Sequence, residues 1–162
     1  MSKNPKNFDL SEILDLNKIE AVNKPIEKAH GLPNECYTSK KYLMIERERV
    51  FQNKWIAIGI GSSVPNPGDA LPYNLLGIPL IILRDKESKI RVFHNVCSHR
   101  GYKLLDKPCS LKNLLRCPYH SWSYDLEGKL VATPHIGGLN IHESEKFERS
   151  KSNLKEVRSK IW

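Results

Sequence analysis

Hydrophobic and polar positions divide the chain into a weakly patterned N-terminal stretch and a longer stretch of short apolar segments. Residues 1–33 are mostly polar, although Ser11 could cap a short helix that runs to Ile19. Gly31-Leu32-Pro33 ends this stretch, because glycine and proline both interrupt a helix. We expect residues 1–36 to form an arm that becomes ordered against another subunit or domain.

A helical pattern follows over residues 40–53. Thr38 and Ser39 are suitable N-cap residues, since a hydroxyl at this position accepts a hydrogen bond from the first helical turn. The apolar residues approximate one helical face, at Leu43, Ile45 (or Met44), Val50 and Phe51. Charged residues fill positions 46–49 and lie mainly outside that face. The pattern predicts one amphipathic helix that covers a sheet.

From Trp55 onward the pattern changes to short apolar segments separated by turn residues. The expected strands are residues 54–61, 70–76, 78–84 and 89–95, with a strand, turn and strand over 123–131. Leu154 and Val157 could begin one more strand, without a partner in this chain. Short strands at this spacing predict a mainly β fold, a small sandwich or barrel preceded by the arm and one helix.

Length and composition limit the domain count and the class of protein. The chain has 162 residues, which suits one domain and a fragment of a second. We expect the β domain at residues 37–138 and the start of another domain at 139–162. No apolar run has membrane-spanning length, and residues 1–10 lack the apolar core of a signal peptide. We therefore expect a cytoplasmic protein with no membrane partner.

The candidate chemistry lies in two short segments that each combine a cysteine with a histidine, Cys97-Ser98-His99 and Cys117-Pro118-Tyr119-His120. A two-Cys, two-His zinc finger instead groups its cysteines together and then its histidines. If the two loops face each other, Cys97 and Cys117 meet on one iron while His99 and His120 meet on the other. That is the ligand set of a Rieske 2Fe–2S centre, where two histidines replace two cysteines on one iron.

The residues around both segments resemble the N-terminal Rieske domain of the Rieske non-haem iron oxygenases, the ring-hydroxylating and choline- and betaine-type enzymes. The matching positions are Cys97, His99, Arg100, Gly101, Cys117, Pro118, Tyr119, His120 and Trp122. The resemblance covers about residues 30–135 and implies a small Rieske-type β sandwich with two cluster-binding loops. It also implies which residues surround the cluster, namely Arg100, Gly101, Tyr119, Ser121, Trp122 and Tyr124.

Four positions refine the resemblance. Ser121 stands where the family most often has glycine, and a serine is sterically harder to accommodate if the backbone there needs a positive φ. Tyr102 and Tyr119 occupy the places of two cysteines that form a disulfide in Rieske proteins of the cytochrome bc type. Those proteins also carry a serine hydroxyl where this chain has Trp122. One fewer hydrogen-bond donor near the cluster favours the lower part of the Rieske range, roughly −150 to +300 mV.

The resemblance implies an electron-transfer function. In the family, the cluster accepts electrons one at a time from a flavin- or ferredoxin-type reductase. It passes them to a mononuclear iron that activates dioxygen, usually across a subunit boundary of a trimer. That Fe(II) would lie in a catalytic domain missing from these 162 residues. The arm and the unpartnered last strand favour this reading over a self-contained Rieske ferredoxin-type carrier, and the ligand order disfavours a zinc-stabilised interaction module.

The charge balance is consistent with a protein partner. A net charge of +8 and a pI of about 9.3 raise the question of nucleic acid, but the basic residues form no recognised nucleic-acid motif. Between Arg84 and Arg116, nine Lys or Arg residues accompany three acidic ones. A basic rim around a redox centre suits docking of an acidic electron donor, and a solvated basic surface is the alternative. We expect no nucleic-acid partner.

The remaining cysteines and histidines are weaker candidates for a functional site. Cys36 and Cys109 lie far apart in the sequence and are expected to stay reduced. His94 is expected to pack or to form hydrogen bonds rather than to bind a metal. Two histidines and one carboxylate, at His135, His142 and Glu143, are the residue types of a non-haem iron site. The family's own triad has a different spacing, which disfavours such a site here.

Overall fold

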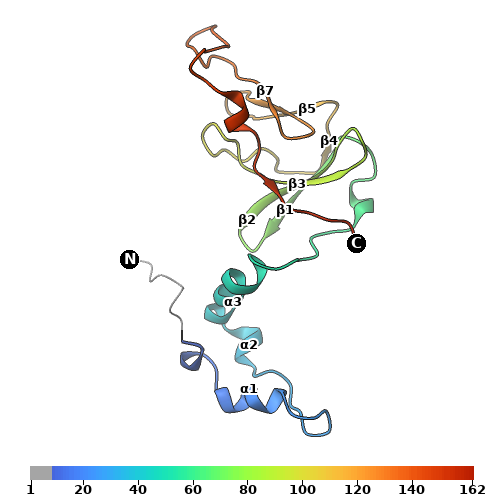
Figure 1. Ribbon diagram of the computed structural model, residues 1–162, viewed down its shortest axis with the longest axis vertical. Helices are drawn as coiled ribbons and strands as arrows, with labels where there is room; N and C mark the ends of the chain where they lie inside the picture. The colour runs from blue at the N-terminus through green and yellow to red at the C-terminus, as the bar shows by residue number, and fades with distance from the viewer. Residues whose placement is uncertain (1–8) are drawn as a thin grey trace. The chain divides into compact units, whose positions relative to one another are not determined.

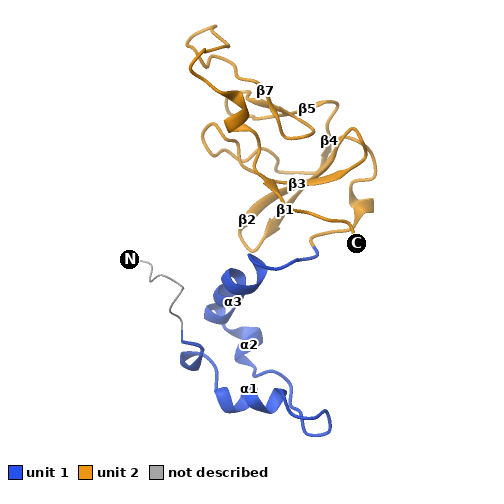
Figure 2. Cartoon of the chain, in the orientation of Figure 1, with its two compact units in different colours: residues 1–57 blue, residues 58–162 orange. Residues whose placement is uncertain are grey.

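Figure 1 shows the computed structural model, which describes residues 9–162. The chain forms two compact units, divided between residues 57 and 58 and coloured separately in Figure 2. The predicted domain boundaries at 36/37 and 138/139 do not coincide with this division, and they stay predictions. Among residues 9–162, no helix is both long enough and apolar enough to cross a membrane.

Unit 1 begins with a 3-10 helix, Leu10–Glu12, and a short α-helix, α1 (Leu16–Val22). The prediction of a single helix capped by Ser11 is wrong. Asp9 and Asp15 instead have extended backbones, and each accepts a hydrogen bond from the backbone N–H two residues later. An aspartate in this conformation caps the helix that begins at the next residue. Asp9 and Asp15, six residues apart, therefore start two separate helices.

The helix predicted over residues 40–53 is present, as an α-helix followed by a π-helical turn. Ser39 caps α3 (Lys40–Glu46) by accepting a hydrogen bond of 3.3 Å from the backbone N–H of Tyr42. The chain continues as a π-helical turn, Arg47–Phe51, and a short helix that was not predicted, α2 (Glu35–Thr38), precedes the cap. Within α3 only Ile45 is buried. The helix was also predicted to cover a sheet. Because the helix belongs to unit 1 and the sheet to unit 2, this part stays a prediction.

Unit 2 contains an antiparallel sheet in the order β4-β1-β2-β3-β8. Its strands are β1 (Asp69–Leu75), β2 (Ile78–Arg84), β3 (Ile90–His94), β4 (Cys109–Ser110) and β8 (Glu156–Val157). The central strand, β2, is buried on both faces: Ile81 and Leu83 join one core cluster, whereas Leu80 and Ile82 join another. Because side chains alternate between the faces, a strand covered on both sides reads as a continuous apolar run.

A smaller sheet in the order β5-β6-β7 completes the unit. Its strands are β5 (Leu114–Arg116), β6 (Ser123–Asp125) and β7 (Leu130–Ala132). One core cluster takes Phe93 from the larger sheet and Tyr124 and Leu130 from the smaller one, so the two sheets share a core. The prediction of a mainly β fold of the Rieske type is confirmed.

The strands differ from the expectation in three ways. The strand predicted over residues 54–61 is absent: β4 and β8 are the edges of the large sheet, and neither pairs with this segment. Its Ile58 packs instead against the apolar cluster on one face of that sheet, which accounts for its hydrophobic pattern. The short strands β4 and β5 were missed. The last strand does have a partner, since Val157 of β8 pairs with Val92 of β3.

Candidate metal centre

The first candidate loop, Cys97–Tyr102, follows β3. The backbone N–H of Cys97 donates to the carbonyl of Tyr102 at 2.8 Å, and the N–H of Gly101 donates back to the carbonyl of Cys97 at 2.9 Å. Gly101 has a φ of 69°, a left-handed conformation that closes this tight turn. Buried Asn95 fixes the return of the chain, because its side-chain oxygen accepts from the N–H groups of Leu104 and Leu105 at 3.0 and 2.9 Å.

The second candidate loop, Cys117–Trp122, has the same backbone pattern. It joins β5 to β6, whose register pairs Arg116 with Ser123. The N–H of Cys117 donates to the carbonyl of Trp122 at 2.8 Å, and the N–H of Ser121 donates back to the carbonyl of Cys117 at 3.0 Å. Ser121 has a φ of 60°, so it does take the positive φ at which a serine is less favourable than glycine.

The shared backbone explains how the two spacings serve one site. Each loop begins with its cysteine, whereas the histidine comes third in one loop and fourth in the other, at His99 and His120. The two cysteines are therefore equivalent by position, and each is almost fully buried, with 1% of Cys97 and 2% of Cys117 exposed. Burial is the main reason that the pKa of the Cys97 thiol is raised, and the neighbouring Cys117 raises it further.

A hydrogen-bond network surrounds the Cys97 sulfur. The Tyr124 hydroxyl lies 3.2 Å from that sulfur and 2.8 Å from the Ser98 hydroxyl, and it accepts from the backbone N–H of Ser98 at 3.1 Å. Tyr124 is completely buried, and burial raises the pKa of its phenol above the ordinary value of 10.0. Tyr124 therefore keeps its proton, as a donor to sulfur requires.

The two candidate imidazoles lie together on the outer side of the cysteines. The ring centroids of His99 and His120 are 4.8 Å apart. Trp122 stacks on His99 with a centroid separation of 4.5 Å and an interplanar angle of 10°, and Tyr119 contacts His120 at 3.8 Å. Burial lowers the pKa of His99 first, and nearby His120 and Arg100 lower it further. A neutral imidazole is the form that binds a metal.

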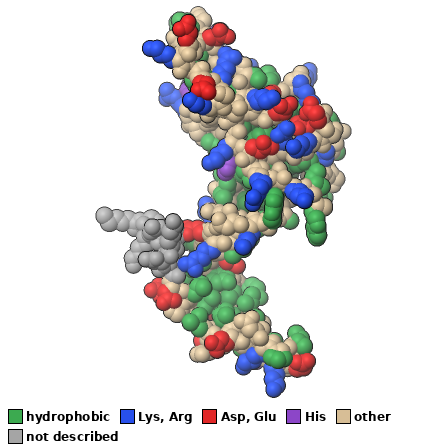
Figure 3. Space-filling view, in the orientation of Figure 1, with side chains coloured by type: hydrophobic (Ala, Val, Ile, Leu, Met, Phe, Trp, Pro, Cys, Tyr) green, Lys and Arg blue, Asp and Glu red, His purple; other side chains and the backbone are tan. Residues whose placement is uncertain are grey.

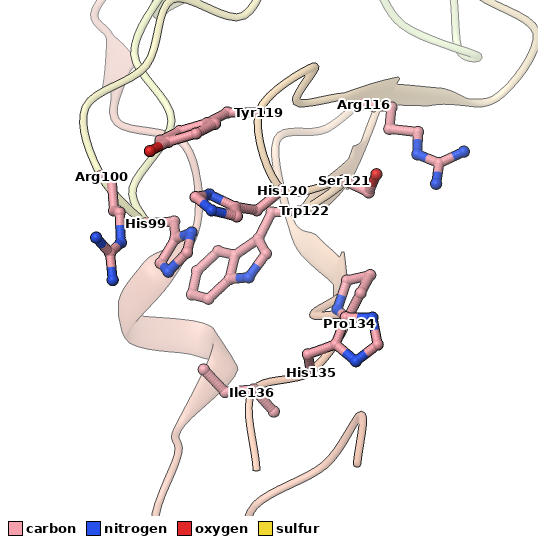
Figure 4. Close-up of a pocket in the computed structure, with 10 residues that line it drawn as sticks. All are labelled: His99, Arg100, Arg116, Tyr119, His120, Ser121, Trp122, Pro134, His135 and Ile136. Atoms are coloured by element: carbon pink, nitrogen blue, oxygen red, sulfur yellow. The ribbon is translucent and has the colours of Figure 1, made fainter. Parts of the chain in front are cut away.

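A hollow of about 570 Å³ opens beside the imidazole pair. Figure 4 shows Trp122 lying against His99, with Arg100 and Arg116 on opposite sides of the view. Pro134, His135 and Ile136, from the segment after β7, form another wall of the hollow. The imidazoles are thus reachable from the surface, whereas the thiols are not.

This arrangement suits two metal ions with unlike ligands better than one. Within residues 9–162, no group of three or more His, Cys, Asp or Glu side chains gathers where it could hold a single metal ion. A tetrahedral zinc site would bring Cys97, Cys117 and both histidines to one point. Here the sulfurs form an inner pair and the imidazoles an outer pair, so the residues fit a binuclear cluster with one iron at each end.

The other predicted candidates lie apart from this centre or at its edge. All four cysteines of the chain are free, including Cys36 and Cys109. The backbone N–H of His94 donates to the carbonyl of Lys155 at 2.9 Å. His135 and His142 do lie together, with ring centroids 5.1 Å apart, but the Nδ1 atom of His142 accepts from the backbone N–H of His135 at 3.1 Å.

Sequence reasoning missed several residues that shape the centre. Ser98 contacts Tyr124 and donates a hydrogen bond to the carbonyl of Ser152, which lies 54 positions further along the chain. Phe147 packs edge-on against Trp122, with ring centroids 5.4 Å apart. Asn95 carried a usable signal, since an amide that directly follows an apolar strand often organises a loop. The contacts of Ser98 and Phe147 depend on the path of the chain after residue 138 and had no local signal.

Comparison with known proteins agrees with this geometry. The family model of the Rieske [2Fe-2S] domain matches residues 54–143. The carnitine monooxygenase oxygenase subunit of Acinetobacter pittii is 34% identical over 126 residues, which are 78% of this chain and 33% of the relative. The chloroplastic choline monooxygenase of Arabidopsis thaliana is 32% identical over 138 residues, 85% of this chain and 31% of the relative. The chain thus spans about a third of the length of these curated relatives.

Solved structures give the same result. A quaternary ammonium Rieske monooxygenase, described for carnitine oxidation and inter-subunit electron transfer, matches with a TM-score of 0.67 and 32% identity, covering 80% of this chain and 34% of that one. The naphthalene 1,2-dioxygenase of Rhodococcus sp. matches with a TM-score of 0.65 and 28% identity, covering 75% and 27%. The chain belongs to the Rieske 2Fe–2S domain family, in the branch found in oxygenase subunits.

Proposed function

We propose that Cys97 and Cys117 bind the inner iron of a 2Fe–2S cluster and that His99 and His120 bind the outer one. Burial of the cysteines supports this assignment, because thiolates held away from water suit the inner end of a cluster. The surrounding residues would be Arg100, Gly101, Tyr119, Ser121, Trp122 and Tyr124. When bound, such a cluster carries one electron at a time. The chain itself lowers the pKa of His99, which favours its neutral form, orients His99 with Trp122 and excludes water from the sulfurs.

We further propose that the chain is the electron-entry portion of an oxygenase alpha subunit in the cytoplasm. The observation that carries this proposal is the mixed Cys/His pair on two loops of matching backbone, in a chain whose relatives are oxygenase subunits. Its donor would be a flavin- or ferredoxin-type reductase, and its acceptor a mononuclear Fe(II) in a catalytic domain that these 162 residues do not contain. As in the relatives, the oxidised substrate could be a quaternary ammonium compound.

The exposed apolar surface of unit 1 supports an assembly with further subunits. Figure 3 shows hydrophobic side chains gathered on the visible face of this unit. Its exposed large hydrophobic residues include Leu16, Ile26, Tyr37, Leu43, Met44 and Val50. Contiguous apolar surface of this kind marks sites of association. We propose that unit 1 packs against another subunit or domain of a trimer.

One observation favours the alternative, a self-contained Rieske electron carrier. Strand β8 pairs with β3, so an edge strand of the large sheet comes from the segment after the smaller sheet. A carrier needs only the cluster and a docking surface, both of which unit 2 could provide. Sequencing the gene beyond the codon for Trp162 distinguishes the two functions. A continuing reading frame that encodes a second iron site supports the oxygenase, and a stop codon supports the carrier.

Metal analysis of cysteine and histidine variants tests the cluster assignment. The purified chain should contain two iron and two acid-labile sulfide ions. Cys97→Ser and Cys117→Ser should lose this content, whereas the matched variants Cys36→Ser and Cys109→Ser should keep it. His99→Ala and His120→Ala should lose it, with His135→Ala as the matched control. Zinc in place of iron, or full iron content in Cys117→Ser, would overturn the assignment.

A further inference from the structure

The hydroxyl of Tyr124 lies near two hydrogen-bond acceptors but has only one proton to donate. Its oxygen lies 2.8 Å from the Ser98 oxygen and 3.2 Å from the Cys97 sulfur, and it already accepts from the Ser98 backbone N–H at 3.1 Å. A phenol has a single O–H to donate. The Ser98 oxygen and the Cys97 sulfur are therefore the two acceptors between which that proton is shared.

The position of the Ser98 proton decides how the contact with Tyr124 is made. Ser98 also has only one hydroxyl proton, and its oxygen contacts the backbone carbonyl of Ser152. A carbonyl can only accept, so Ser98 must donate to Ser152. Its oxygen is then left to accept from Tyr124. Ser152 thus turns Ser98 into a competitor of Cys97 for the Tyr124 proton.

We propose that Ser98, oriented by the carbonyl of Ser152, draws the Tyr124 proton away from the Cys97 sulfur and so lowers the reduction potential of the cluster. The inference rests on the proposed function, in which Cys97 binds iron. A hydrogen bond to a cluster sulfur stabilises the more negative reduced state, so a shared proton stabilises it less. Ser98 is a positioning residue, because it acts on the cluster through Tyr124.

The same contact links the potential to a remote segment of the chain. Ser152 ends a 3-10 helix, Arg149–Ser152, and the next residue, Asn153, accepts a hydrogen bond of 2.9 Å from the backbone N–H of Leu130 in β7. If this segment moved away, the Ser98 hydroxyl would be free to donate to Tyr124, and the Tyr124 proton would pass fully to Cys97. A displacement of residues 149–152 should therefore raise the potential.

Redox titration of four variants tests the proposal. Ser98→Ala removes the competitor and should shift the midpoint potential to a more positive value. Ser98→Thr keeps the hydroxyl and should titrate like the unmodified protein. Tyr124→Phe removes the shared proton and should shift the potential to a more negative value. In the Tyr124→Phe background, Ser98→Ala should have no further effect, because nothing is left to compete for.

The outcomes separate this inference from the proposed function. An absence of iron in the unmodified protein would mean that the proposed function has failed. With the cluster present, an unchanged or more negative potential in Ser98→Ala would overturn the inference, and so would an equal positive shift in both backgrounds. If Tyr124→Phe does not retain its cluster, Asn153→Ala replaces it: loosening the segment should give a smaller positive shift, and no shift would overturn the inference.

Discussion

Gly101 and Ser121 occupy the same position in the two loops and have nearly the same left-handed conformation, with φ of 69° and 60°. Each donates its backbone N–H to the carbonyl of the cysteine that begins its loop. Only Gly101 is free of the strain that a side chain suffers at positive φ. The fold therefore places one unfavourable residue directly beside His120.

Exchanging these residue types should change stability in opposite directions. Ser121→Gly should raise the free energy of unfolding by up to about 1 kcal/mol, because a left-handed φ suits glycine. Gly101→Ala should lower it by about 1 kcal/mol. No atom lies within 4 Å of a Cβ at Gly101, so its effect would come from backbone strain alone. Urea unfolding measures both, and a destabilised Ser121→Gly would contradict the assignment of strain.

Asn95 should be among the most sensitive residues outside the two loops. Its buried side chain bonds to three backbone groups: it accepts from the N–H groups of Leu104 and Leu105, and donates to the carbonyl of Leu105 at 2.6 Å. Asn95→Ala would leave these groups unsatisfied, at about 3 kcal/mol or more. Asn95→Asp should also destabilise the fold, because a buried carboxylate keeps the acceptor but cannot donate to the Leu105 carbonyl. The exposed Asn66→Ala is the control, and an equal effect there would contradict the account.

His94 should make the stability depend on pH. Burial lowers its pKa below the ordinary value of 6.5, and the charge of Lys155 lowers it further. The folded state thus favours neutral His94, so its contribution is fully present above pH 6.5 and is lost as the pH falls through the folded pKa. Urea unfolding between pH 5 and 8 should show a smaller acid loss in His94→Gln. An equal or larger acid loss would contradict this prediction.

Basic residues beside the imidazole pair should govern electron delivery. Arg100 and Arg116 both line the hollow at the histidines. Arg100→Glu or Arg116→Glu should slow reduction by a reduced acidic ferredoxin by about tenfold or more at low salt, because steering depends on local charge. Stopped-flow absorbance measures the rate, and added salt should reduce the difference. Lys86→Glu, in the turn between β2 and β3, is the matched charge reversal and should change the rate little.

The sequence predicted those features whose signals are local. The positions of β1, β2 and β3 followed from apolar runs bounded by turn residues. Ser39, one of the two hydroxyl residues predicted as N-caps, does cap α3. The chemistry of the centre followed from two short Cys/His segments. The family's preference for glycine at position 121 raised the question of a positive φ there, which the structure answers with a φ of 60° at Ser121.

Features that depend on distant partners could not be predicted in this way. The segment around Ile58 has the apolar pattern of a strand, yet it lies on a sheet face where no backbone neighbour is available. Strands β4 and β5 are only two and three residues long, too short for alternation to be recognised. The contact of Ser98 with Ser152 joins residues 54 positions apart, so it requires the path of the whole C-terminal segment.

Spectroscopy of the irons tests the central claim most directly, that one iron has two cysteine ligands and the other two histidine ligands. The protein would be labelled with ⁵⁷Fe and ¹⁵N-histidine, then reduced by one electron. Mössbauer spectra should resolve two unlike irons. Electron–nuclear double resonance should detect two histidine nitrogens coupled to the cluster, and both signals should remain in the control variant His135→Ala. Two equivalent irons, or no coupled histidine nitrogen, would contradict the account.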